Sequence, residues 1–402
     1  MINLENFIAE KIVKRPKGLL KDDLEKFNAE LHKKIDGRSV IVIGGAGTIG
    51  SSYIKAILKF NVKRLYVVDI NENGLTELVR DIRSSTGYNI PQDFKTYPIN
   101  FGDAVFEKMF VNEGPFEIVA NFAAHKHVRS EKDEYSIEAM IENNVLKAKK
   151  LLDLLLKHKP EHFFCVSTDK AANPVNIMGA SKKLMEEVIM AYSDSIPITT
   201  ARFANVAFSN GSLPQGFLER YSKRHPWSCP SDVKRFFVSP LESGQICMMA
   251  SVLGKSGDIF FPKLDMVNDM QPFTMIVDAL LNEYGLKPEI CKTEEEARQK
   301  ALLLKDDSTT YPVYYFSSDT SGEKAYEEFY TEQEELDMKT FPNLGVVKNT
   351  KARSKEEIEG IFMNLRNLFA HGTTKAGLVE TLKKYLPNFE HIETGKNLDQ
   401  KM

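Results

Sequence analysis

The sequence predicts an α/β protein with a doubly wound parallel sheet, a smaller C-terminal lobe and a helical tail. Between residues 39 and 203, short apolar runs alternate with amphipathic helical stretches, which is the pattern of repeated β-α units. After Asn205 the alternation stops, and Pro226, Trp227 and Pro230 predict irregular chain. This change of pattern indicates that a second, differently built lobe follows the sheet.

The individual elements follow from local patterns. Apolar runs predict strands at residues 39–43, 65–68, 94–100, 117–122, 162–167 and 198–203. Helical periodicity predicts the intervening helices, at residues 73–83, 105–110, 136–157 and 178–192. Leu20, Leu24, Phe27 and Leu31 recur at helical spacing before the first strand, which predicts an amphipathic lead-in.

These elements divide the chain into four expected parts. They are a helical lead-in over 1–37, a main domain over 38–205, a substrate-binding lobe over 206–348 and a helical extension over 349–402. Ser239, Pro240 and Glu242 form a helix-capping signal. We expect the helix that they begin, 239–253, to return to the main domain.

Composition narrows the classes of partner. The 402 residues are 42% hydrophobic, enough for a sizeable core, and the net charge of -3 favours neither nucleic acid nor an anionic membrane. No apolar run approaches the length of a membrane span, and the first residues lack the pattern of a secretory signal. The four cysteines lack metal-ligand spacing, and His125 and His127 have no cysteine or carboxylate at ligand spacing, so we expect no metal. A reduced cytoplasmic protein fits these features best.

A glycine-rich turn follows the first strand. It reads as GxGxxG through Gly45, Gly47 and Gly50, or as GxxGxxG through Gly44, Gly47 and Gly50. Such glycines permit a tight turn and close approach of the backbone to a pyrophosphate, which the next helix N-terminus then faces. The second strand ends in Asp69, whose carboxylate can bind an adenosine ribose and would repel a 2′-phosphate. The order of strand, glycines, helix and acid predicts a Rossmann-type domain that binds NAD rather than NADP. The alternative is an ordinary glycine turn and a solvated aspartate.

A second polar cluster ends the strand at 162–167. Ser167, Thr168, Asp169 and Lys170 follow its apolar residues directly. Ligands of open α/β sheets bind outside the carboxyl ends of the strands, and an adjacent acid and amine there suit proton transfer. The alternatives are a solvated loop or a structural ion pair.

Several short motifs occur in the order of a known family. They lie at residues 44–50, 121–128, 167–171, 178–182, 202–206, 211–214, 235–237 and 322–324. On these motifs the chain resembles the extended short-chain dehydrogenase/reductases from about residue 39 to residue 324. Among them it is similar to the UDP-N-acetylglucosamine 4,6-dehydratases of polysaccharide biosynthesis.

The chain departs from the family pattern at a few positions. Met178 stands where the superfamily has its catalytic tyrosine, although a branch of these dehydratases also carries methionine there. Asn100 stands where many relatives have an aspartate for adenine. Ala204, Ala207 and Phe208 replace glycine-rich surroundings, which implies an altered sugar pocket.

The resemblance implies a reaction and roles for four residues. The sugar is oxidised at C4 by NAD, loses water across C5 and C6, and is reduced at C6. Asp169 would be the acid for the C6 oxygen, with a pKa raised by burial, and Lys170 the base at C5, with a lowered pKa. Thr168 would bind the C4 hydroxyl, and Lys182 the nicotinamide ribose. With Met178 unable to ionise, a Thr168–Lys182 or water relay would assist the oxidation at C4.

The resemblance also implies binding residues and partners. The residues expected to bind NAD are Gly44, Gly47, Thr48, Ile49, Gly50, Asp69, Asn100, Phe101, Ala123, Ala124 and Lys182. Those expected to bind the nucleotide sugar are Lys126, Asn205, Ser212, Leu213, Phe217 and Arg235. A homo-oligomer is expected. Two other functions remain open: a nucleotide-sugar 4-epimerase or reductase, and a non-catalytic nucleotide-binding scaffold.

Overall fold

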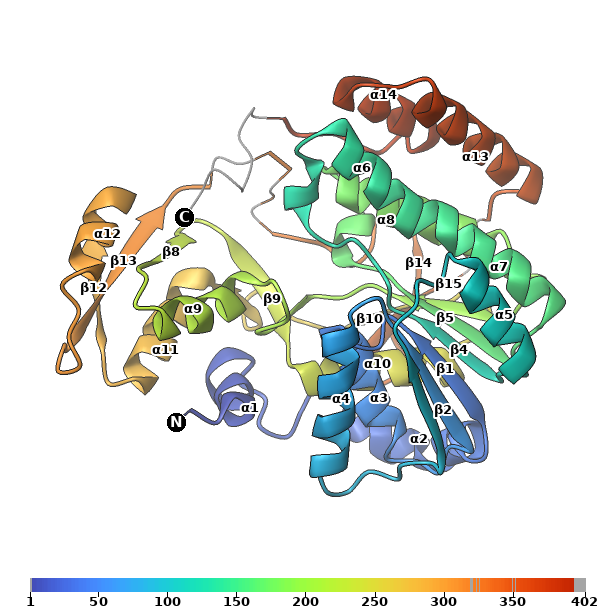
Figure 1. Ribbon diagram of the computed structural model, residues 1–402, viewed down its shortest axis with the longest axis horizontal. Helices are drawn as coiled ribbons and strands as arrows, with labels where there is room; N and C mark the ends of the chain where they lie inside the picture. The colour runs from blue at the N-terminus through green and yellow to red at the C-terminus, as the bar shows by residue number, and fades with distance from the viewer. Residues whose placement is uncertain are drawn as a thin grey trace.

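The computed structural model describes residues 2–318, 321–322, 324, 326–348, 350 and 352–393. Its centre is a nine-stranded sheet in the order β14-β15-β10-β6-β5-β4-β1-β2-β3 (Figure 1). The strands from β10 to β3 are parallel, and β15 and β14 pair antiparallel at one edge. The members of this sheet are β1 (Ser39–Ile43), β2 (Arg64–Val68), β3 (Asp93–Tyr97), β4 (Ile118–Asn121), β5 (His162–Val166), β6 (Ile198–Ala201), β10 (Ile259–Pro262), β14 (Glu335–Asp337) and β15 (Leu344–Lys348).

Helices cover both faces of the sheet, so its central strands are buried throughout. One face carries α2 (Lys21–Ile35), α3 (Thr48–Ile57), α4 (Glu72–Ser84) and α10 (Pro240–Leu253) (Figure 1). The other carries α5 (Ala104–Glu113), α6 (Glu134–Ile141), α7 (Lys147–Lys157) and α8 (Ile177–Met190). This arrangement confirms the predicted fold class. The helix predicted at 136–157 is interrupted by a π-helical turn at Glu142–Leu146.

Helix α10 returns to the main sheet and packs against α3. A Cβ atom at Gly244 would lie 2.2 Å from the carbonyl oxygen of Ser52, so glycine permits this close approach. The capping box of Ser239 and Glu242 forms at its N-terminus. Helix α10 thereby covers the sheet behind the glycine-rich turn.

The smaller lobe has its own sheets and its own core. Its two three-stranded sheets have the orders β11-β9-β7 and β12-β13-β8. The elements of the lobe are β7 (Asn205–Val206), α9 (Leu213–Ser222), β8 (Trp227–Pro230), β9 (Lys234–Val238), β11 (Met270–Pro272), α11 (Phe273–Glu283), β12 (Lys287–Cys291), α12 (Glu294–Ala301) and β13 (Thr310–Phe316).

The N-terminal segment bridges both parts. Phe7 and Ile12, from α1 (Leu4–Phe7) and the π-helical turn Ile8–Ile12, belong to the core of the smaller lobe. Leu20 and Leu31 belong to the core of the main domain. The lead-in is therefore two helical pieces, which serve two different cores.

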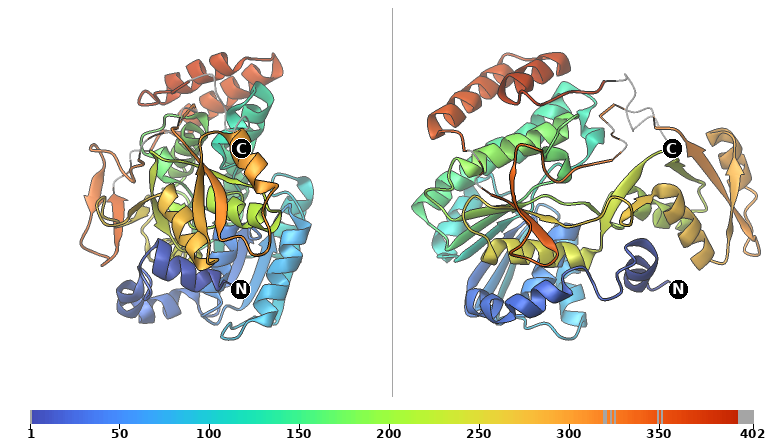
Figure 2. Two further views of the ribbon diagram at one scale, coloured as in Figure 1. Left: turned by 90° about the vertical axis from the view of Figure 1, so that its left-hand side faces the viewer. Right: turned by 180° about the vertical axis from the view of Figure 1, so that it is seen from behind.

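The C-terminal extension forms two antiparallel helices, α13 (Lys355–Ala370) and α14 (Lys375–Tyr385), on the outer side of α6 and α8 (Figure 2). Beyond α14, the Ile392 N–H donates to the Val175 carbonyl over 3.0 Å, and the Gly322 N–H donates to the Ile392 carbonyl over 2.9 Å. The chain returns in this way to the loop before α8. The end of the predicted extension, 394–402, lies outside the described residues, as does Glu323 of the motif at 322–324. Within the described part, no helix is long and apolar enough to cross a bilayer.

Candidate active site

The glycine-rich turn between β1 and α3 is shaped by close backbone contacts. Gly44 has a φ of 75°, and a Cβ atom there would lie 2.5 Å from the amide nitrogen of Ala123. A Cβ atom at Gly50 would lie 2.3 Å from the Gly44 carbonyl oxygen, and one at Gly45 would lie 2.3 Å from a methyl group of Val67. Both glycine patterns read from the sequence therefore contain positions that the fold requires.

Gly47 differs from its neighbours. A Cβ atom there would meet only the Gly44 carbonyl oxygen, at 3.5 Å, which is ordinary contact. The protein itself does not demand glycine at this position. A ligand that approached this backbone closely would require glycine here, and a dinucleotide pyrophosphate is such a ligand.

A cavity opens beside this turn, at the carboxyl ends of β1, β2 and β4. Asp69 closes one side of it, with its carboxylate accepting hydrogen bonds from the N–H groups of Ala46 (3.0 Å) and Asn71 (2.9 Å). Seven of the predicted cofactor residues line the cavity: Gly44, Gly47, Asp69, Asn100, Phe101, Ala123 and Ala124. The Asp69 carboxylate suits the adenosine ribose of NAD, and Gly47 and the N-terminus of α3 suit its pyrophosphate.

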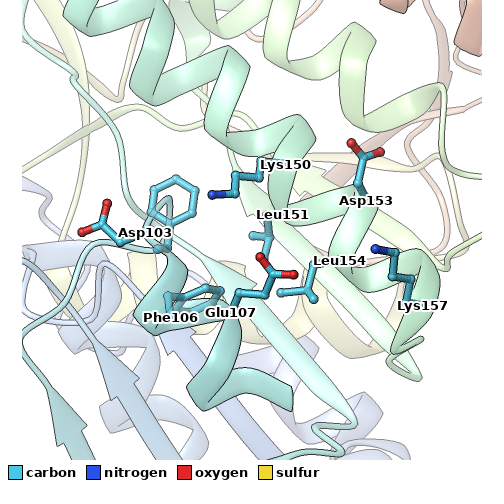
Figure 3. Close-up of a pocket in the computed structure, with 9 residues that line it drawn as sticks. Asp103, Phe106, Glu107, Lys150, Leu151, Asp153, Leu154 and Lys157 are labelled. Carbon is cyan, nitrogen blue, oxygen red and sulfur yellow. The ribbon is translucent and has the colours of Figure 1, made fainter. Parts of the chain in front are cut away.

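The other predicted cofactor residues take different places. Thr48 begins α3 and its hydroxyl oxygen accepts the N–H of Asn210 over 2.9 Å, which links the turn to the start of the smaller lobe. Ile49 packs partly against the main core, and Gly50 closes the turn. Figure 3 draws a second hollow, between α5 and α7, which shares only Phe101 with the predicted cofactor residues.

The polar end of β5 forms a compact hydrogen-bonded cluster. Asp169 Oδ1 accepts from the Thr168 hydroxyl (2.8 Å), the Lys170 backbone N–H (2.9 Å) and the Lys170 ammonium (3.1 Å). Asp169 is 4% exposed. The two groups predicted as acid and base are thus joined as an ion pair, which was the structural alternative considered from the sequence.

A third charged group joins this pair. Glu327 is buried, and its Oε1 atom lies 3.7 Å from Lys170 Nζ. Burial alone would lower the pKa of the Lys170 ammonium, but Asp169 and Glu327 outweigh it and raise that pKa. This direction is opposite to the lowered Lys170 pKa expected from the sequence, because that expectation considered burial and a cationic nicotinamide but not the charges of Asp169 and Glu327.

Lys182 and Met178 lie beneath the cluster on α8. Lys182 is buried, donates to the Val166 carbonyl over 2.6 Å, and has a pKa lowered by that burial. Met178 is also buried, and its backbone N–H donates to a carboxylate oxygen of Glu131 over 3.1 Å. The methionine therefore occupies the tyrosine position without offering a group that ionises.

The predicted sugar-binding residues come from several segments. Lys126 is exposed to solvent in the loop after β4, and partial desolvation by the surrounding chain lowers the pKa of its ammonium. The next residue, His127, lies against Gly211, where a Cβ atom would be 2.8 Å from its ring. Ser212 caps α9 by accepting the Gln215 N–H. The loop after β4 and the turn before α9 are thus adjacent.

The remaining sugar-binding candidates divide into two groups. Asn205 on β7 pairs with Phe237 of β9, the strand that also carries Arg235. Phe217 is 0% exposed and stacks on Trp227 at 5.0 Å, and Leu213 packs against the same core. Phe217 therefore lies in the core of the smaller lobe, where its side chain is not exposed to a ligand.

Comparison with known proteins gives the family. The family model described as "Polysaccharide biosynthesis protein" matches residues 40–349. The chain belongs to this family. Its fold, an extended short-chain dehydrogenase/reductase fold, confirms the resemblance drawn from the sequence.

Individual relatives share less than a third of their aligned residues with this chain. The "Uncharacterized membrane protein MJ1061" of Methanocaldococcus jannaschii is 29% identical over 77% of this chain and 85% of its own length. The "Probable polysaccharide biosynthesis protein EpsC" of Bacillus subtilis is 28% identical over 80% of this chain, which spans 49% of that protein's length. The solved structure of Pen from Bacillus thuringiensis aligns with a TM-score of 0.62 and 20% identity, over 83% of this chain and 99% of that one.

Glu327 was not predicted as a site residue, because the last motif of the family resemblance ends at residue 324. Only its place three residues after Lys324 could have drawn attention to it, since no local pattern relates it to Lys170. Arg235 was predicted to bind the nucleotide sugar. In the structure it is buried and donates to the Lys324 carbonyl over 2.9 Å, near this same cluster.

Proposed function

We propose that this chain removes water from a nucleotide-activated hexose, UDP-N-acetylglucosamine, giving a 4-keto-6-deoxy sugar for surface polysaccharide or glycan synthesis. One observation carries the proposal: the hydrogen bond of 3.1 Å between the Lys170 ammonium and the Asp169 carboxylate. This pair follows β5, the strand next to β4, whose carboxyl end borders the NAD cavity. An acid and an amine are therefore near the place where the sugar would meet the cofactor.

Bound NAD supplies the transient oxidation that acidifies the C5 proton of the sugar. The protons for water loss come from the pair itself. Moving one proton from Lys170 Nζ to Asp169 Oδ1 converts the ion pair into a neutral amine and a carboxylic acid. The amine then takes the C5 proton, and the acid protonates the C6 oxygen, which leaves as water. Water loss thus returns both groups to the charges seen in the structure. When the sugar is then reduced at C6, the Lys170 ammonium gives a proton to C5, and the proton released from the C4 hydroxyl restores that ammonium.

Assistance to the oxidation at C4 falls to residues near Met178. The Thr168 hydroxyl donates a hydrogen bond to Asp169. Lys182, one turn after Met178 on α8, is buried, and burial lowers the pKa of its ammonium. A lowered pKa favours the neutral amine, which can accept a proton through a hydroxyl or a water. This supports a relay that carries the C4 hydroxyl proton to Lys182 through Thr168 or a water.

The test is product analysis in heavy water. The purified chain with NAD and UDP-N-acetylglucosamine should give a sugar one water lighter that carries solvent deuterium at C5, as measured by mass spectrometry. Lys170→Met and Asp169→Asn should each lower its formation by at least about 100-fold while NAD stays bound.

The same experiment separates the other functions. A product of unchanged mass but altered configuration at C4 would make the chain an epimerase and overturn the proposal. Recovery of the intact sugar with NAD bound, across a panel of UDP-, GDP- and dTDP-sugars, would support a non-catalytic role.

A further inference from the structure

Glu327 is held in place from both sides of its loop. Upstream, Lys324 Nζ donates to the Asn173 carbonyl over 2.6 Å, and Asn176 donates to the Gly322 carbonyl over 2.8 Å. Downstream, Arg202 donates to the Phe329 carbonyl over 3.0 Å. These anchors reach the loop before α8 and strand β6, so the position of Glu327 beside the end of β5 is fixed by the fold.

Three further charged groups lie around Lys170 and Glu327. Asp169 is acidic, whereas Arg235 and Lys324 are basic. Burial raises the pKa of the Glu327 carboxyl, and the neighbouring Asp169 carboxylate raises it further, while Lys170 opposes both. The Lys170 ammonium therefore has one carboxylate at 3.1 Å and a second at 3.7 Å.

Two carboxylates are more than the acid–base exchange needs. Asp169 alone can receive the proton that Lys170 must give up, and its Oδ1 atom already accepts three hydrogen bonds. A second negative charge near Nζ favours the ammonium and so opposes loss of that proton. Its effect is to control when Lys170 becomes a base.

We propose that Glu327 is a positioning residue for Lys170: its carboxylate holds the Lys170 ammonium beside Asp169 and sets how readily that ammonium gives up its proton. The inference rests on the proposed function, since it assigns a regulator to the base of that reaction. It also makes a statement about Lys170 that can be measured without any substrate.

The experiment labels Lys170 with an amine acylating reagent and follows its peptide by mass spectrometry over a range of pH. Only the neutral amine reacts, and below the pKa its fraction rises tenfold for each unit by which the pKa falls. An opposite charge at this distance shifts a pKa by about 1–3 units, so Glu327→Gln should label at least about tenfold faster. Its pH curve should also level off at a lower pH than that of the wild type.

Two variants control this measurement. Glu328→Gln removes the same charge from the exposed neighbouring residue, which binds Asn173, and should label at the wild-type rate. Glu327→Asp keeps the charge and should remain close to wild type even if Glu327→Gln folds poorly. A mere opening of the site would raise the rate by one factor at every pH and leave the shape of the curve unchanged. That result, or an unchanged rate in Glu327→Gln, would overturn the proposal.

A second readout keeps this proposal apart from the proposed function. In the wild type, the rate of C5 proton exchange should rise with pH as Lys170 loses its proton, and in Glu327→Gln the rise should come at lower pH by about 1–3 units. If the wild type makes no dehydrated sugar, the proposed function fails, yet the labelling result still decides whether Glu327 controls Lys170.

Discussion

Arg202 and Glu186 form a buried ion pair, with Arg202 Nη2 2.8 Å from Glu186 Oε2. The Ser167 hydroxyl donates to the same carboxylate over 2.6 Å, and Arg202 also pairs with Glu334 at 2.8 Å. The network joins β6 and α8 to the loop that carries Glu327. Its integrity therefore bears on both the fold and the candidate active site.

Replacing Glu186 by glutamine should cost about 3 kcal/mol of unfolding free energy at neutral pH, because the buried Arg202 loses a charged partner. Burial alone would raise the pKa of the Glu186 carboxyl, but Arg202 outweighs it and lowers that pKa to about 2. Because folding lowers the pKa of this carboxyl, its ionised form stabilises the folded protein fully at pH values above 4.5, the ordinary carboxyl pKa. This contribution is lost as the pH falls from 4.5 toward 2. Urea denaturation should show the difference between wild type and Glu186→Gln shrinking below about pH 4.5.

An exposed ion pair provides the control for this prediction. Glu77 lies 3.4 Å from Arg80, and both side chains are solvated. Glu77→Gln should leave the unfolding free energy almost unchanged, since exposed pairs contribute little. A Glu186→Gln effect that stays constant from neutral pH down to acid would contradict the assignment.

His162 supplies a second pH dependence, at higher pH. Its Nε2 atom lies 2.8 Å from the Thr199 hydroxyl oxygen, and that hydroxyl donates to the Ala250 carbonyl over 2.7 Å. The ring nitrogen must therefore be the donor, which fixes a neutral tautomer protonated on Nε2. Burial, with a smaller contribution from Lys34, lowers the pKa of His162 to about 4.

Between pH 6.5 and 4, the unfolded chain binds one proton more at His162 than the folded chain does. The unfolding free energy should thus fall by about 3 kcal/mol as pH drops through this window. His162→Phe should lose that slope in urea titrations, whereas His225→Gln, a change at an exposed histidine, should keep it. Equal slopes in wild type and His162→Phe would sink the prediction.

Gly47 and Gly50 should respond differently to alanine. A methyl group at Gly47 meets only one atom at ordinary contact distance, so Gly47→Ala should melt like the wild type. It should nevertheless weaken NAD binding by at least about tenfold, because the pyrophosphate approaches that backbone. Gly50→Ala places a methyl group 2.3 Å from the Gly44 carbonyl and should lower the melting temperature itself. Calorimetry of NAD binding with thermal melting separates the two, and unchanged NAD affinity in Gly47→Ala would contradict the cofactor assignment.

The parallel sheet could be predicted from the sequence because each strand is a short apolar run followed by helical periodicity. The turn 44–50 and Asp69 were predicted for the same local reason, since all lie within two successive β-α units. The smaller lobe was harder to predict from the sequence. Residues 227–230, predicted as irregular chain, form strand β8. This strand pairs with β13 across a long stretch of chain, and no local pattern carries that information.

The candidate site divides in the same way. Asp169 and Lys170 are neighbours, so their pairing was among the alternatives. Glu327 reaches them from a distant loop, and its charge adds to that of Asp169 in raising the Lys170 pKa. Phe217 was predicted to bind the sugar, but its ring stacks on Trp227 inside the smaller lobe. The position of a residue within a motif does not reveal whether its side chain packs in the core or faces a ligand.

The segment after α14 offers the last prediction. Ile392 bridges two parts of the active-site surroundings: its N–H binds Val175 in the loop before α8, and its carbonyl binds the N–H of Gly322. Ile392→Pro removes the first of these hydrogen bonds and fixes the local backbone. Helices α13 and α14 keep their own buried contacts, so we expect little change in the melting temperature.

The effect of Ile392→Pro should instead fall on the reaction. Loosening Gly322 frees one anchor of the Glu327 loop, and small misplacements of catalytic groups are costly, so formation of the dehydrated sugar should drop by at least about tenfold. Ile392→Val keeps the N–H and changes only a partly exposed side chain, so it should react like the wild type. Product formation at the wild-type rate in the proline variant would mean that the returning C-terminal segment does not position the Glu327 loop.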